Sequence, residues 1–192
     1  MPIESWFSTP VYYDKVDYNT QHLIESEVNS IIGVINFDKN PEWGKQNHSL
    51  SNPDFSSNLF SDFNLKTLER TILIHMNNYV SQSKKPLKGK IINSWFTKTE
   101  PTEYVMTHNH GSVDMSGVYY FKTSGKDGSL FFMNPLSALA GTLFLDNNEV
   151  ISYAPEVGKI LLFPGWLNHG VKSNDTDDVR ISISFNICFE RI

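Results

Sequence analysis

Short strand-like runs recur at regular spacing along the second half of the chain, from Lys90 onward. Gly, Pro, Asn and Asp residues separate them, as at positions 124–128 and 146–148, and no helical pattern intervenes. This spacing favours antiparallel pairing in a β-sandwich or barrel over βαβ units, so we predict a mainly β fold of the α+β class. The runs lie at 91–96, 116–121, 129–133, 142–145, 150–153, 159–163 and 180–189.

The first half of the chain has a different character, with helical patterns at 20–32 and 64–80 and polar loops at 37–43 and 46–55. In the second helical pattern, apolar residues recur at helical spacing, and Asn64 is placed to cap the first turn. We expect this helix to lie along the outside of a sheet. A length of 192 residues, 40% of them hydrophobic, fits a single domain at 1–192, with a helical and loop part at 1–89 and a β core at 90–192.

Composition disfavours several classes of partner. The formal net charge is −5 and no basic run is present, so nothing favours nucleic acid or an anionic membrane. The single cysteine, Cys188, can form no internal disulfide, which favours a reducing compartment, and we expect it to be a small buried apolar residue. The N-terminal residues resemble no signal peptide, and no run is long enough to span a membrane. We predict a cytoplasmic protein.

The last strand-like run alternates strictly between polar and apolar side chains. Arg180, Ser182, Ser184 and Asn186 would share one face, and the residues between them the other. One interpretation is an edge strand whose polar face meets water. The other is a strand that lines an open barrel, where the arginine could bind a carboxylate with two hydrogen bonds. The strand alone does not decide between them.

Three histidines suggest a metal site. His108 and His110 point to the same side if their segment is extended, and His169 follows an apolar run and a Pro-Gly turn that would return the chain to the barrel mouth. Imidazole suits Fe, Zn, Cu or Ni, and three protein ligands leave positions for a co-substrate and oxygen. Taken singly, a His-x-His pair is often a surface feature, and His169 is equally compatible with a hydrogen-bonded structural role.

Taken together, these segments resemble a known family, the 2-oxoglutarate- and Fe(II)-dependent oxygenases of bacteria and phages. The N-terminal Trp6–Tyr12 segment also resembles the opening of that family, so the similarity extends over nearly the whole chain. The resemblance implies a double-stranded β-helix, or jelly roll, with helices packed on its major sheet. It also implies Fe(II), with 2-oxoglutarate as co-substrate. The segments that carry it are 108–110, 116–120, 162–169 and 180–186.

Carried over residue by residue, the resemblance makes His108 and His169 metal ligands and catalytic residues. His110 stands where the wider superfamily usually has Asp or Glu, and three neutral imidazoles would leave the site more positive than two with a carboxylate. Asp114 is an alternative third ligand, or a group that orients a histidine. We expect His110 to be the ligand, because the i, i+2 spacing needs no special loop.

The resemblance also assigns the co-substrate site. Arg180 matches the family's carboxylate-binding arginine, Ser182 would add a hydroxyl on the same face, and Tyr120 is a further candidate. Tyr119 and Tyr120 are equally compatible with ordinary core aromatics. Asn93, Trp95 and Asn186 could line the cavity, although we expect structural roles for them. His22, His48 and His75 are interpreted as surface or helix-packing residues.

The activity implied is that of a dioxygenase, which would hydroxylate an unidentified small molecule or peptide with release of succinate and CO2. The substrate would enter over the polar loops at 37–55, where Trp43, His48 and Phe55 are available for contacts. Exposed strand edges favour a homodimer. Two rival interpretations are a cupin-like protein that binds or isomerises a small molecule, and a non-catalytic jelly-roll structural protein. The first predicts indifference to 2-oxoglutarate, and the second predicts no metal dependence and a stability unaffected by His169→Ala.

Overall fold

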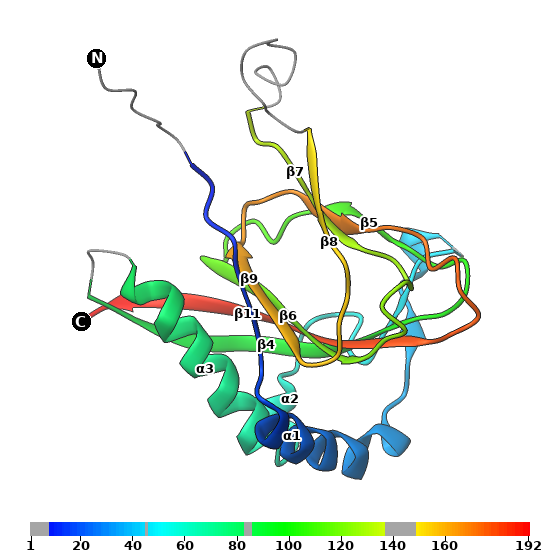
Figure 1. Ribbon diagram of the computed structural model, residues 1–192, viewed down its shortest axis with the longest axis horizontal. Helices are drawn as coiled ribbons and strands as arrows, with labels where there is room; N and C mark the ends of the chain where they lie inside the picture. Colours follow the sequence, from blue (N-terminus) through cyan, green and yellow to red (C-terminus); the bar gives the residue numbers. More distant parts are fainter. Residues whose placement is uncertain (1–7, 45, 83–85, 137–148) are drawn as a thin grey trace.

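The computed structural model describes residues 8–44, 46–82, 86–136 and 149–192. Two antiparallel sheets face each other: a seven-stranded major sheet in the order β1-β9-β6-β11-β4-β3-β2, and a four-stranded minor sheet in the order β5-β10-β7-β8. Figure 1 shows the helices on one face of the major sheet and the minor sheet on the other. The predicted mainly β, jelly-roll class is confirmed. The major sheet's strands are β1 Tyr12–Lys15, β2 Asp38–Lys39, β3 Ser49–Leu50, β4 Leu87–Thr99, β6 Met115–Lys122, β9 Lys159–Pro164 and β11 Arg180–Arg191, and the minor sheet's are β5 Val105–His108, β7 Leu130–Met133, β8 Val150–Tyr153 and β10 His169–Val171.

Helices α1 (Tyr18–Ile31), α2 (Leu59–Asp62) and α3 (Lys66–Ser81) cover the major sheet, as predicted for the second helical pattern. Two short 3-10 turns complete the helical part, at Ile32–Val34 and Pro41–Trp43. The buried side chains of α1 and α3 join those of β4, β6, β9 and β11 in one apolar cluster. Because this cluster occupies one face of the major sheet, the other face is left to line the space between the sheets.

The predicted cap at Asn64 is wrong. Helix α3 begins at Lys66 after Leu65, whose side chain makes no capping bond. The first N–H groups of the helix are instead bound by Glu27 of α1, which accepts from Thr67 N at 2.7 Å and from Leu68 N at 3.1 Å. A carboxylate suits a helix N-terminus better than an amide does, because it carries negative charge toward the positive end of the helix dipole.

Strand β11 lies in the middle of the major sheet, paired with β4 on one side and β6 on the other. The edge-strand interpretation is therefore wrong. Its apolar side chains pack in the cluster beneath the helices, where Ile183, Phe185 and Ile187 are fully buried. Its polar side chains face the space between the sheets, as a strand that lines a barrel requires.

Part of the segment predicted as polar loops is ordered sheet. Strands β2 and β3 pair with each other, and β3 pairs with β4, so residues 38–50 extend the major sheet at one edge. Strand β1 extends the opposite edge by pairing with β9. The predicted strand at 142–145 and the turn at 146–148 lie outside the described residues. Cys188 is half-buried at the pairing with Lys90, rather than fully buried as expected.

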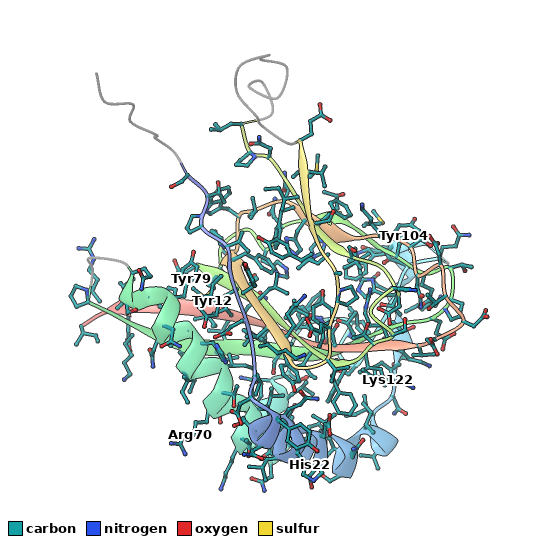
Figure 2. All side chains as sticks on the ribbon, in the orientation of Figure 1. Tyr12, His22, Arg70, Tyr79, Tyr104 and Lys122 are labelled. Carbon is teal, nitrogen blue, oxygen red and sulfur yellow. The ribbon has the colours of Figure 1, made fainter. Side chains whose placement is uncertain are left out.

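Figure 2 shows His22 on the outer side of α1, in agreement with the surface role predicted for it. His75 is buried on α3 and hydrogen-bonds to the Tyr12 hydroxyl at 2.8 Å, so it packs the helix against β1 as predicted. Among the helices of the described ranges, none is both long and apolar enough to cross a membrane.

Candidate functional site

A cavity of about 450 Å³ lies between the two sheets. Its walls come from the polar face of β11, from β4 and β6, from the minor sheet, and from the segment between β2 and α2. A volume of this size is typical of small-molecule sites. The cavity brings together all six residues assigned to the site by the resemblance: His108, His110, Tyr120, His169, Arg180 and Ser182.

The three histidines converge at one end of the cavity. His108 of β5 and His169 of β10 are register partners in the minor sheet, and their ring centroids are 4.4 Å apart. His110 follows β5, and its backbone N–H donates to the Gly165 carbonyl at 2.8 Å. One ligand atom from each histidine lies within 4.8 Å of the others, and His110 Nε2 is 3.3 Å from His169 Nε2.

Backbone carbonyls fix how two of these rings present their nitrogens. His108 Nδ1 donates to the Met106 carbonyl at 2.8 Å, and His169 Nδ1 donates to the Leu167 carbonyl at 2.7 Å. A carbonyl can only accept, so the proton lies on Nδ1 and the lone pair on Nε2 is free to bind a metal ion.

Desolvation disfavours charge on the cluster, in which His169 is buried, His110 is half-buried and His108 lies at the open side. Desolvation lowers the pKa of His108, and lowers the pKa of His110 to about 4 and that of His169 to about 3, with repulsion from His108 adding to both shifts. All three imidazoles are therefore neutral at pH 7, with one N–H and one lone pair each, and this is the form that binds metals.

Asp114 does not join the cluster. Its carboxylate accepts a hydrogen bond from the Phe189 backbone N–H at 2.7 Å, beside the pairing of β6 with β11. Within the described ranges, His108, His110 and His169 are the one group of three or more metal-ligating side chains close enough to share an ion.

Arg180 is held firmly by its surroundings in the same cavity. Its Nη1 donates to the carbonyls of Asp127 and Gly128 at 2.6 and 2.8 Å, and its Nη2 donates to Thr99 Oγ1 at 2.7 Å. The side chain is 1% exposed, and the guanidinium keeps its charge although burial lowers its pKa. Gly128 has φ of 98°, and a Cβ there would lie 2.2 Å from the Lys172 carbonyl oxygen, so only glycine allows this turn.

Hydroxyl groups neighbour the arginine. Ser182 lies two residues along β11 and is the register partner of Tyr120 on β6. Both side chains line the cavity, and burial raises the pKa of Tyr120 to about 12, which keeps its hydroxyl protonated and able to donate. Tyr119 instead belongs to the cluster beneath the helices, so the two tyrosines have different surroundings.

A family model described as "Putative 2OG-Fe(II) oxygenase" matches residues 93–186, the span that carries the histidines and Arg180. Residues 93–186 carry the core of a 2-oxoglutarate- and Fe(II)-dependent oxygenase. The cofactor of the oxygenase is therefore iron, and its co-substrates are 2-oxoglutarate and O2. No curated protein matches the chain significantly.

Solved structures of other oxygenases share the fold at low sequence identity. The epimerase SnoN from nogalamycin biosynthesis has a TM-score of 0.66 at 12% identity, over 94% of this chain and 79% of its own. HygX from Streptomyces hygroscopicus, with nickel and 2-oxoglutarate bound, has a TM-score of 0.62 at 13% identity over 94% and 83%. A prolyl hydroxylase from Trichoplax adhaerens has a TM-score of 0.64 at 10% identity over 93% and 83%.

The donor set of the oxygenase fits iron. Nitrogen atoms that share one ion at about 2.0–2.1 Å can lie up to about 4.2 Å apart. The 3.3 Å between the Nε2 atoms of His110 and His169 falls within that limit, and since all three ligand atoms lie within 4.8 Å of one another, a small side-chain movement brings the whole set onto one ion. Neutral imidazole is a suitable ligand for iron. The geometry is therefore compatible with His108, His110 and His169 as metal ligands.

Sequence reasoning misjudged one cavity residue, His48. His48 is neither on the surface nor packed on a helix: it is 5% exposed and lines the cavity, and desolvation lowers its pKa to about 3. Asn93, Trp95 and Asn186 also line the cavity, and the Asn186 Oδ1 accepts from Ser116 Oγ at 2.7 Å. The alternation of β4 was the available signal for Asn93 and Trp95, whereas nothing local in the sequence marks His48.

Proposed function

We propose that His108, His110 and His169 hold the iron, and that Arg180, Ser182 and Tyr120 hold the distal carboxylate of 2-oxoglutarate. The observation that carries the proposal is the convergence of three neutral imidazoles in the cavity that also contains a buried guanidinium. Asp114 is not needed as a third ligand, because its carboxylate already binds the Phe189 N–H.

The reaction proposed is hydroxylation of a small molecule or peptide. Bound iron and 2-oxoglutarate supply oxygen activation, coupled to decarboxylation of the co-substrate to succinate and CO2. The Arg180 fork binds the distal carboxylate with charge-assisted hydrogen bonds, and its contacts with the Asp127–Gly128 turn hold it in that orientation. The buried walls exclude water, which strengthens these electrostatic contacts.

Each histidine contributes through its position and charge. The carbonyls of Met106 and Leu167 orient the rings of His108 and His169, and desolvation keeps the ligand nitrogens unprotonated. The Trp95 ring stacks beside His110 at 6.1 Å between centroids and restricts that ring's rotation. A preassembled donor set of this kind binds an ion without first reorganising the protein.

The test is an anaerobic visible spectrum of the iron-loaded protein, before and after addition of 2-oxoglutarate. We expect a metal-to-ligand charge-transfer band that is absent from the His169→Ala variant. Folded protein that binds iron but gives no band would contradict the co-substrate assignment and favour the cupin-like alternative. Folded protein that binds no iron would favour the non-catalytic alternative.

We also propose a cytoplasmic location and a homodimer that forms through strand edges. The edge strands available for pairing are β1 and β2 in the major sheet and β5 and β8 in the minor sheet. Light scattering of the purified protein tests the dimer, and a monomer mass at high concentration would contradict it.

A further inference from the structure

Aromatic rings form a continuous wall from the surface to the histidine cluster. Trp43 stacks on His48 at 5.4 Å between centroids and lies 6.1 Å from Phe55, and Phe55 meets Trp95 edge-on at 4.8 Å. Trp95 in turn stacks beside His110 at 6.1 Å. We call these four rings the aromatic wall, and all of them line the cavity: Trp43, His48, Phe55 and Trp95.

The backbone at Phe55 is strained. Its φ of 57° lies in the left-handed region, which is unfavourable for a bulky side chain and persists only where the surroundings fix it. The turn is held by the Phe55 N–H, which donates to the Asn52 carbonyl at 3.2 Å, and the conformation places the half-buried ring against Trp95. Such strain concentrates at ligand-contacting positions.

The wall carries no formal charge. Among the described residues that line the cavity, none is acidic, none is lysine, and Arg180 is the permanently charged residue. Desolvation holds His48 neutral, with its pKa lowered to about 3. Three amides line the cavity with the wall. The buried Asn93 Oδ1 has no hydrogen-bond partner among the described residues, and Asn47 and Asn109 each use one N–H, on the Trp43 carbonyl and on Asn168 Oδ1, and keep the other.

We propose that the aromatic wall is the substrate subsite and that it binds an uncharged ring, held by stacking and by hydrogen bonds from the neighbouring amides. This inference rests on the proposed function, because it places the substrate beside the His110 end of the cluster. The shape of the ligand follows from the flat faces of Trp43, Phe55 and Trp95, which pack best against another ring.

Charged rings are disfavoured for separate reasons. The faces of aromatic rings are negative, so they repel an anionic group, and no positive side chain lies among the wall residues to offset the cost of desolvating it. A cationic ring would be attracted by the faces, but it would meet no carboxylate and would be repelled by Arg180 and by bound iron.

A matched set of probes tests the inference: benzamide, which is neutral, benzoate, which is an anion, and benzamidine, which is a cation. All three are titrated into anaerobic protein loaded with iron and 2-oxoglutarate, with saturation-transfer NMR and tryptophan fluorescence as readouts. We expect benzamide to bind at least tenfold more tightly than either charged probe. Phe55→Ala and Trp43→Ala should each weaken benzamide at least fivefold while the affinity for 2-oxoglutarate stays unchanged.

The matched control is Trp166→Ala, which removes a tryptophan that is 51% exposed and is not part of the cavity wall. Benzamide binding should be unaffected by it. The charge-transfer band of the loaded protein is recorded in the same samples, so failure of iron or co-substrate binding is seen separately. Normal loading with no preference for benzamide, or with benzamide binding that survives both wall variants, would overturn the inference.

Discussion

The histidine end and the arginine end of the cavity are prepared for their ligands in different ways. Three hydrogen bonds to Asp127, Gly128 and Thr99 hold Arg180 in place. At the histidine end, carbonyls fix two rings from behind, but the nitrogens that face the cavity meet only each other, with 3.3 Å between the Nε2 atoms of His110 and His169. Because no backbone carbonyl within the described residues fixes the His110 tautomer, its Nε2–H can donate to the His169 Nε2 lone pair at this distance, and a metal ion would replace that hydrogen bond.

The difference indicates which end depends on its ligand. The arginine end is complete within the protein, so its geometry should change little whether or not a carboxylate is bound. At the histidine end, the Nε2 lone pairs of His108 and His169 face the cavity and have no backbone partner among the described residues, so a cation there gains bonds that the protein alone does not supply. Bound metal should therefore stabilise mainly the minor sheet, because β5 and β10 of that sheet carry His108 and His169.

Loss of a histidine from the cluster should have the largest effect. His169→Ala is expected to weaken iron binding at least about 100-fold, since each ligand to a protein-bound metal contributes roughly 3 kcal/mol or more. Anaerobic equilibrium dialysis with iron measures this. The matched control is His48→Ala, which removes a buried cavity histidine that is not part of the cluster. Equal losses in both variants would mean that the cluster is not the iron site.

Metal removal should destabilise the wild-type protein. At a free metal concentration of about 100 times Kd, bound metal adds about 2.7 kcal/mol to the free energy of unfolding. Denaturant unfolding with and without Ni(II) tests the expectation. His110→Ala should lose most of the gain, whereas Arg180→Met should keep it. A full metal-induced gain in His110→Ala would show that the third ligand lies elsewhere.

Removal of the Arg180 guanidinium should weaken the binding of 2-oxoglutarate. Arg180→Met is expected to weaken 2-oxoglutarate binding by about 2 kcal/mol or more, roughly 30-fold, because a charge-assisted pair is lost. Iron affinity should not change. The affinity for 2-oxoglutarate is measured from the rise of the charge-transfer band as 2-oxoglutarate is added. The control is Lys122→Met, which removes an exposed positive charge at the end of β6. Unchanged co-substrate affinity would refute the assignment of Arg180.

Acid should destabilise the iron-free protein through its buried histidines. His48 has a pKa of about 3 when folded and near 6.5 when unfolded, so between these values the unfolded state binds the extra proton. Stability is therefore retained above about pH 6.5 and falls by about 1.4 kcal/mol per pH unit for this one group below it. His48→Gln should reduce the slope by that amount between pH 6 and 5. An unchanged slope in urea unfolding would contradict the burial of His48.

Asp114→Asn should have the smallest effect. It weakens the hydrogen bond to the Phe189 N–H and should cost about 0.5–1.5 kcal/mol of stability. Iron affinity should remain at the wild-type value, because the carboxylate lies outside the cluster. A fall in iron affinity that exceeds the fall in stability would return Asp114 to the ligand set.

The predictable parts of the fold are those that local patterns encode. The alternation of Arg180, Ser182, Ser184 and Asn186 indicated a strand with one polar face, because side chains alternate with a period of two along a strand. Its central place in the major sheet depends on pairing with β4 and β6, which are distant in sequence, and so the edge-strand interpretation stayed open until the structure excluded it.

Non-local contacts account for what the sequence missed. Strands β5 and β10 are too short for a local pattern to reveal them, and β10 is held by pairing with β7 and with β5, where His108 lies opposite His169, 61 positions apart (169 − 108). The capping of α3 by Glu27 joins two helices, and local propensity at Asn64 could not reveal it. His48 gave no signal because its burial depends on β3 docking against β4.

Two groups of cavity residues come from different parts of the chain, and the pairing of β3 with β4 joins them. Residues 38–55 contribute Trp43, His48 and Phe55 to the aromatic wall, while β5 with the loop after it, β10 and β11 carry the three clustered histidines and Arg180. Strand β3 joins the sheet through only two register pairs, Ser49 with Lys98 and Leu50 with Thr97. If the proposed roles hold, an exchange of residues 38–55 for a segment of another sequence should alter substrate choice while iron and 2-oxoglutarate binding stay unchanged.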